Sequence, residues 1–349
     1  MPSGNKDFSL VASGQRFEGW KSVRVSQSLE QLAPNYVLGI REPIGEPGES
    51  PRIVEGSAAL LQWGGETIVD GYVDDSDSTY DATTASATVS GRAKTGDLVD
   101  CSAIFETGEW KNRTLLDIAS DLCDPYGIGV SADADVGAAI RRFSIQEGET
   151  VFECIERAAR MRGLLTVTST VGDLVFARAG SRRTETVLEF GKNVVRSSRR
   201  GSWKDRFSKY HCKAQSKGDD NWFGEDAAVQ KRTAKDAHIT RHRPLVVLAE
   251  GQESGRELQK RADWERNVRY GKSHRLTYRV GGWECAEGLW LPNTLAHVKD
   301  PRHRLDEELL VVRTTAIRND GGTWTDLELT RAEAFDVLTL PEKRSESWF

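Results

Sequence analysis

The sequence has 349 residues, of which 38% are hydrophobic and 29% charged, and its formal net charge is −5. A chain of this length is expected to fold into roughly two to four compact units. The small acidic excess argues against general or sequence-specific binding of nucleic acid, which normally needs a basic surplus. No run of about 18 apolar residues is present, so no membrane-spanning helix is predicted. The first residues, MPSGNKDFSLVASGQRF, lack an apolar secretory segment, so we expect the protein to be made in a cytoplasm and to stay there or leave by a non-secretory route.

The first hundred residues have the alternating pattern of antiparallel β-strands. Val23 and Val25 alternate with polar residues. Gly64 and Gly65 separate two apolar runs in ALLQWGGETIVDGYVDD, as a hairpin turn does. Four to six short strands in one stretch predict a small barrel or sandwich.

Residues 101–184 predict a middle domain that contains both helices and strands. Thr114 is a candidate N-cap for a helix over LLDIASDLC. Thr150 and Glu153 have the spacing of a capping box at the start of a second helix, and Gly163 stands where a C-terminal glycine is expected. LLTVTSTVGDLVFARAG follows as a predicted hairpin. We therefore expect an α+β domain here.

Strand-like alternation returns in residues 185–228 and 271–340. Between them, residues 250–270 have helical spacing, with Leu258, Ala262 and Trp264 as expected buried positions. Residues 341–349 are expected to form a C-terminal tail. The residues alone predict a mainly β, multi-domain chain with an α+β insertion.

The segment from residue 69 to 103 is rich in acidic residues, glycine, serine and threonine. Its acidic cluster consists of Asp70, Asp74, Asp75, Asp77 and Asp81. The cluster lacks the spacing of an EF-hand loop, and the same residue types are typical of tight turns. The turn interpretation is therefore favoured over calcium binding, as it is for SADADVG at 131–137.

Other candidate sites have equally simple structural explanations. His238 and His242 are four residues apart, but no supporting ligand pattern accompanies them and Pro244 ends any helix soon afterwards. GIGVSA at 127–132 follows Asp124-Pro125 rather than a buried strand, so it does not predict a dinucleotide loop. The five cysteines contain no C-x-x-C pair and predict reduced, mostly buried thiols: Cys101, Cys123, Cys154, Cys212 and Cys285.

No motif predicts catalysis, a metal site or a cofactor, so the sequence favours a protein that is not an enzyme and carries none of these groups. The stretch SRRTETVLEFGKNVVRSSRRGSWKDR contains eight basic and three acidic residues. An anion-binding patch and a charged, exposed strand edge both fit this composition, and the strand edge is the more common explanation.

Several segments resemble one known family. DGYVDD, followed by VSGRAKTGDLVDCSA, resembles the baseplate hub proteins of Mu-like contractile phages, which are grouped with the late control gene D tail proteins. FEGWKSVRVSQSLEQLAPNYVL and FSIQEGETVFECIERAARMRGLL are similar to the first strands and the middle domain of that family. SWKDRFSKYHCKAQ, RHRPL, RADWERN and GLWLPN follow in the family's order. The resemblance covers about residues 8 to 340.

The resemblance implies a structural hub with a fold similar to the trunk of type VI secretion spike proteins. It implies a homotrimer in which two small antiparallel β-barrels per subunit form a ring of six barrels. Residues 1–100 would form the first barrel, and residues 185–228 and 271–340 the second. Segment 229–270 would leave the second barrel and join the middle domain of residues 101–184. The ring would adapt a six-fold tail tube to a three-fold central spike, with the tape-measure protein as a further partner. The expected location is the virion tail baseplate, after assembly in the bacterial host cytoplasm.

Within this family, the acidic stretch is expected to be structural. Gly71 and Gly91 would mark bulges or close approaches of the backbone, and Asp74 or Asp75 would pair with Arg92 across the barrel. The net charge further predicts a neutral or negative channel through which DNA slides without sticking.

The main alternative concerns the middle domain. EGETVFECIERAARMRGLL is loosely similar to a LysM repeat, which would make this domain a binding module for peptidoglycan glycans. Such a groove needs exposed aromatic side chains, whereas Phe143, Phe152 and Phe176 occupy predicted core positions. An embedded cell-wall hydrolase would need a carboxylate pair in a cleft, and the sequence nominates none.

Overall fold

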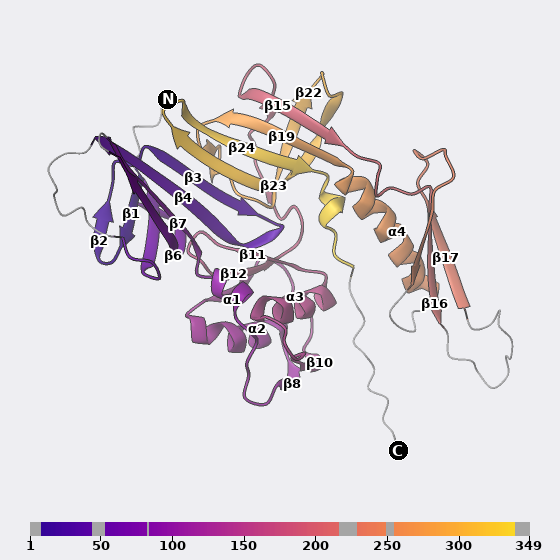
Figure 1. Ribbon diagram of the computed structural model, residues 1–349. Coiled ribbons are helices and arrows are strands. Elements are labelled where there is room, and N and C mark those ends of the chain that lie inside the picture. Colours follow the sequence, from indigo (N-terminus) through magenta and orange to yellow (C-terminus); the bar gives the residue numbers. More distant parts are fainter. Residues whose placement is uncertain (1–7, 44–52, 82–83, 216–228, 249–254, 339–349) are drawn as a thin grey trace.

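The computed structural model describes residues 8–43, 53–81, 84–215, 229–248 and 255–338, and its described part is mainly β. This confirms the predicted fold class. Strands from both ends of the chain meet in one large sheet, and two smaller bodies are attached to it (Figure 1). In the described part of the chain, no helix combines the length and the hydropathy that crossing a bilayer requires.

The first β unit contains the strands that precede residue 94. They are β1 (Phe8–Ala12), β2 (Gln15–Phe17), β3 (Ser22–Ser28), β4 (Gln31–Pro43), β5 (Ala58–Trp63), β6 (Glu66–Tyr80) and β7 (Thr84–Ala93). Alternate residues of these strands are buried in one core, which includes Val25, Leu38 and Leu61. Trp283, from the C-terminal part of the chain, also enters this core, where its ring lies 4.2 Å from that of Phe8.

The second β unit contains the strands on either side of the arm described below. They are β13 (Arg182–Arg183), β14 (Leu188–Glu189), β15 (Val194–Gly201), β19 (His274–Gly281), β22 (Thr294–Asp300), β23 (Leu305–Asn319) and β24 (Gly322–Thr330). Its core is formed by residues such as Leu276, Tyr278, Val311 and Leu327. A two-residue hairpin of β20 (Glu284–Cys285) and β21 (Gly288–Leu289) and the short helix η2 (Ala332–Phe335) complete it.

The two β units are joined in a single sheet because β3 pairs with β23 in antiparallel register, from Val23 opposite Arg318 to Ser28 opposite Arg313. The strand order is β15-β19-β24-β23-β3-β4-β7-β6-β5-β1-β2. Among the described strands no pairing closes either unit into a barrel. Two separate barrels were expected, and the structure instead has two curved halves of one continuous sheet.

The middle unit is a compact α+β body, as predicted. It contains α1 (Gly96–Asp100), β8 (Glu109–Arg113), α2 (Leu115–Cys123), η1 (Asp124–Tyr126), β9 (Val130–Ala132), β10 (Ile140–Ser144), α3 (Val151–Arg162), β11 (Leu165–Thr168) and β12 (Leu174–Ala177). Thr114 and Thr150 each cap a helix through a complete capping box, and Gly163 ends α3 in a left-handed conformation.

A fourth body, which we call the arm, consists of β16 (Lys209–Gln215), β17 (Val229–Lys235), β18 (Pro244–Leu248) and α4 (Gly255–Lys272). Leu258 and Ala262 of α4 are fully buried against Tyr210 and Cys212 of β16, and the arm extends away from the middle unit (Figure 1). The expected assignment of 229–270 to the middle domain is therefore wrong. Likewise, β16 lies in the arm rather than in the second β unit.

A buried ion pair stabilises the base of the arm, next to the two chain segments that join it to the second β unit. Arg206 is only 2% exposed and donates two hydrogen bonds to Asp236, at 3.0 and 2.7 Å. Its guanidinium also lies 4.7 Å from the ring centre of Tyr270 on α4. Both charges are removed from water, so each is stabilised mainly by its attraction to the other.

Candidate assembly surfaces

The acidic stretch ties the first β unit to the middle unit. Arg92 on β7 contacts Asp74 on β6 at 2.7 Å and Asp100 on α1 at 2.8 Å, and the hydrogen bonds that it donates to Asp100 and Asp74 raise the pKa of Arg92. Lys94 lies 3.5 Å from both Asp70 and Asp173. Of the two partners predicted for Arg92, Asp74 or Asp75, the structure shows the pair with Asp74. Through Arg92 and Lys94, these acidic residues therefore link the first β unit to the middle unit.

The other acidic residues do not form a metal site. Asp75 accepts a hydrogen bond from Ser90 at 3.2 Å, and Asp77 is exposed on β6. Asp81 lies just beyond β6. Within the described ranges, no group of three histidine, cysteine or acidic side chains could hold a metal ion. The stretch consists mostly of two long paired strands rather than of turns.

Gly71 and Gly91 are sites of close backbone approach, as predicted. A Cβ atom on Gly91 would lie 2.0 Å from the carbonyl oxygen of Tyr72 and 2.4 Å from the hydroxyl of Tyr36. A Cβ atom on Gly71 would lie 1.9 Å from the carbonyl oxygen of Arg92. Only glycine fits at these two positions.

The remaining sequence candidates are structural. His238 follows the turn at Asp236, outside any helix, and its ring stacks on Tyr270 at 5.6 Å. His242 is exposed in the loop before β18. Residues 127–132 end η1 and lead into β9, and 131–137 continue from β9 into a loop. In the described part of the chain, none of these residues belongs to a group of three side chains that could hold a metal ion.

None of the five cysteines, all of which lie in the described ranges, forms a disulfide, in line with the predicted thiols, and three of them are buried. Burial raises the pKa of Cys123 and of Cys154 to about 12. Phe143 and Phe176 are buried in the middle core, with Phe152 packed against it. These three aromatic side chains therefore do not form the exposed groove that glycan binding would need.

An open, polar face of the sheet crosses the seam between the two β units. Three arginines, Arg275, Arg279 and Arg313, lie among three acids, Glu30, Asp326 and Glu328. Between 25% and 35% of each side chain is exposed. Burial opposes ionisation of Glu30, but Arg275 and Arg313 outweigh it and lower its pKa. These six charges thus balance one another, while Arg196 and Arg200 of β15, opposite Arg279 and Arg275, add positive charge to the same face.

Sequence reasoning missed this network because its members are far apart in the chain. Arg275 and Glu30 are separated by 245 residues, and no local pattern links them. Only the pairing of β3 with β23 brings them together. The sequence shows the alternation of polar residues in β3 and in β23, but this alternation does not specify that the two strands pair with each other.

The strand β15 is an edge of the large sheet, as the basic composition of this stretch predicted. Its outer side has no partner among the described strands. Val195 on this strand is 68% exposed, and Phe190 and Trp203 nearby are also exposed. Edge strands with apolar side chains are ready-made templates for pairing with another chain.

The arm presents a second surface, on the side of its sheet opposite to α4. Its cross-strand rows place Lys235 beside Lys209, and Lys231 beside Lys213, with His211 between them. Burial and these lysines lower the pKa of His211. Val246 and Leu248 of β18 are exposed on the same face. No acidic side chain belongs to the described rows of this basic face.

Comparisons with known proteins agree with this architecture. Three family models match: a Mu phage baseplate assembly protein GpP-like N-terminal domain at residues 7–93, a baseplate hub protein gp44-like second domain at 95–178, and a GpP fourth domain at 254–338. The baseplate hub protein gp44 of Escherichia phage Mu is 35% identical over 347 residues, which cover 97% of this chain and 91% of that protein.

Solved structures show the same fold. The 43 kDa tail protein of prophage MuSo2 from Shewanella oneidensis has a TM-score of 0.86 at 34% identity, covering 95% of this chain and 99% of that one. The E. coli protein c3393, a type VI secretion component similar to the T4 tail proteins gp27 and gp5, has a TM-score of 0.56 at 12% identity, covering 92% of this chain and 76% of that one. The chain therefore belongs to the family of Mu-type baseplate hub proteins, which are structural components of the phage tail.

Proposed function

We propose that three copies of this chain form a closed ring at the base of a contractile phage tail. The observation that carries the proposal is the seam between β3 and β23, which places two curved β units side by side in each chain. Three copies would provide six such units. A ring of this kind presents near six-fold symmetry to the tail tube and three-fold symmetry to the central spike.

The open ends of the large sheet are suited to contacts between copies. The sheet runs from β15 at one edge to β2 at the other, so each copy carries two different exposed edges. A contact between unlike edges is heterologous, and three such contacts close a ring without leaving a free edge. Obligate contacts of this type typically bury on the order of 2,000–5,000 Å².

The polar face across the seam is suited to the lining of a channel. At the seam itself its three arginines are matched by three acids, so these side chains carry no net positive charge. The formal charge of −5 per chain gives about −15 for a trimer. A passing polyanion would therefore not be held by the ring.

We further infer that the protein acts through its contacts, without catalysis. Its partners are a second and a third copy, the tail tube protein, the central spike protein and the tape-measure protein. The ring assembles in the bacterial host cytoplasm and remains in the virion. The arm, which extends from the second β unit, is placed to clasp a neighbour.

Electron microscopy of the purified protein tests this proposal. Class averages should show a ring with three-fold symmetry and six similar lobes around a central opening. Averages with two-fold symmetry, or rings with three lobes, would overturn the assignment of two ring-forming units per chain.

A further inference from the structure

A cavity of about 280 Å³ opens at the end of the second β unit, where β24 leads into η2. Its base is apolar, formed by the buried side chains of Leu276 and Leu309. Its polar lining comes from the ends of β15, β19, β23 and β24: Arg199, His274, His303, Arg304, Glu307 and Arg331.

The wall between β22 and β23 is held by one buried carboxylate. Asp300 is 1% exposed and accepts three hydrogen bonds: from the Tyr278 hydroxyl at 2.9 Å, from His303 Nδ1 at 2.7 Å and from the His303 backbone at 3.1 Å. Burial opposes ionisation of Asp300, yet these donors outweigh it and lower its pKa. His303 is thereby fixed at the cavity.

The next residue, Arg304, has a strained backbone. Its φ of +56° lies in the left-handed region, which L-residues other than asparagine and aspartate rarely adopt. Glycine would avoid this strain, but the chain places a long cation here. Strain at a single residue is often found where a side chain serves a function.

The cavity has more positive than negative charge. Its one acid, Glu307, is bound to Arg331 at 2.8 Å. Arg199 donates a hydrogen bond to His274 Nδ1 at 3.2 Å, so that nitrogen accepts and the imidazole is neutral. Burial, and then Arg199, Arg206 and Arg331, lower the pKa of His274, as expected in a positive potential. Neither Arg199 nor Arg304 has an acidic partner among the described residues.

We propose that this cavity binds an oxyanion, either a carboxylate or a phosphate group, between Arg199 and Arg304. Guanidinium groups present several donors in a fixed plane that matches both anions. The lining residues all belong to the second β unit, so a failure to bind an anion would leave the proposed ring untouched, and the absence of a ring would leave this proposal untouched. Nothing in the hub function assigns a ligand to it.

Titration calorimetry with inorganic phosphate and, separately, with acetate tests the proposal at constant ionic strength, with chloride as the reference. We expect saturable binding of one anion per chain at about millimolar concentration. Tighter binding of phosphate identifies a phosphate site, and tighter binding of acetate identifies a carboxylate site. No saturable heat above chloride from either anion overturns the proposal.

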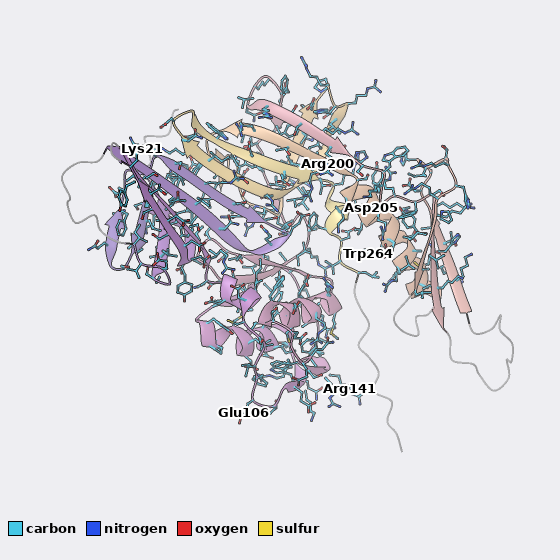
Figure 2. All side chains as sticks on the ribbon, viewed as in Figure 1. Lys21, Glu106, Arg141, Arg200, Asp205 and Trp264 are labelled. Atoms are coloured by element: carbon cyan, nitrogen blue, oxygen red, sulfur yellow. The ribbon has the colours of Figure 1, made fainter. Side chains whose placement is uncertain are left out.

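Two variants and a control complete the test. Arg199→Gln/Arg304→Gln should weaken binding at least ~10-fold, since each arginine supplies charge-assisted hydrogen bonds. The control is Arg200→Gln. Arg200 is the neighbouring arginine on β15 (Figure 2) and does not line the cavity, so this variant should alter binding less than ~2-fold. Arg304→Gly should fold at least as stably as the wild type, because it relieves the positive φ, while binding weakens. Undiminished binding in the double variant would show an anion held elsewhere.

Discussion

At the scale of single residues, the two glycines of the acidic stretch matter because of space rather than charge. Gly91 lies on β7 where the backbone of β6 and the ring of Tyr36 approach it. The sequence stretch predicted that both glycines mark either bulges or close approaches of the backbone. It could not reveal that the atoms involved are backbone oxygens, which cannot move aside as a flexible side chain would.

Replacing Gly91 with alanine should therefore destabilise the protein strongly. The new Cβ would meet the Tyr72 carbonyl oxygen at 2.0 Å, so the paired strands must separate. We expect a loss of about 3 kcal/mol in the free energy of unfolding, measured by chemical denaturation. Gly281→Ala is the control, because its Cβ would meet no atom within 4 Å. Equal stability of the two variants would contradict this account.

Arg206 provides a test of the joint between the second β unit and the arm. Arg206→Met leaves Asp236 buried without its partner and should cost about 3–5 kcal/mol. Arg206→Met combined with Asp236→Asn should recover part of that loss, because no uncompensated charge remains. Hydrogen exchange should locate the damage in β16 and α4. Faster exchange in the middle unit instead would show that the joint lies elsewhere.

The Glu149–Arg157 pair makes the middle unit sensitive to acid. Burial opposes ionisation of Glu149, but hydrogen bonds from Arg157, at 2.7 Å, and from the Gln146 backbone lower its pKa below 4.5. Its contribution is thus complete above pH 4.5 and is lost as pH falls through the lowered pKa of the folded state.

Glu149→Gln should accordingly reduce stability by about 2 kcal/mol near neutral pH. The difference between wild type and variant should shrink as the pH is lowered from about 6 to about 3. Urea unfolding at several pH values measures both effects. A difference that stays constant over this range would show that the carboxylate charge contributes nothing.

At the scale of secondary-structure elements, local signals were sufficient where the interactions are local. The capping boxes at Thr114 and Thr150 and the C-terminal Gly163 all lie within four residues of the groups they satisfy, and all three are confirmed. The pairing of β3 with β23 joins residues almost 300 positions apart, and nothing in either strand specified it. For the same reason, the packing of α4 on β16 and β17 was assigned to the wrong body.

The edge strand β15 yields a prediction at this scale. Val195→Asp places a charge on an exposed strand that we expect to contact another copy, so ring formation should fail while each chain stays folded. Val171→Asp is the matched control, because Val171 is 51% exposed on the β11–β12 turn. Sedimentation velocity compares the two variants. Normal rings of Val195→Asp would remove β15 from the interface.

At the scale of the whole molecule, family membership and the continuous sheet lead to the same function. The sequence resemblance identified a hub of a contractile tail, and the comparisons with the phage Mu hub protein show that family. The arrangement of the two β units could not be obtained from periodicity, because each unit alone has the pattern of an ordinary small barrel. The seam makes one chain a rigid pair of units, which is what a three-copy ring with six positions requires.

The central claim is that three copies assemble into a closed ring, and the mass in solution tests it most directly. Light scattering of the purified protein should give about 116 kDa, three times the 38.8 kDa mass of one chain. That mass should not grow with concentration, because a closed ring has no free contact surface left. A mass of 38.8 kDa at every concentration, unchanged when the tail tube and spike proteins are added, would contradict the proposed ring.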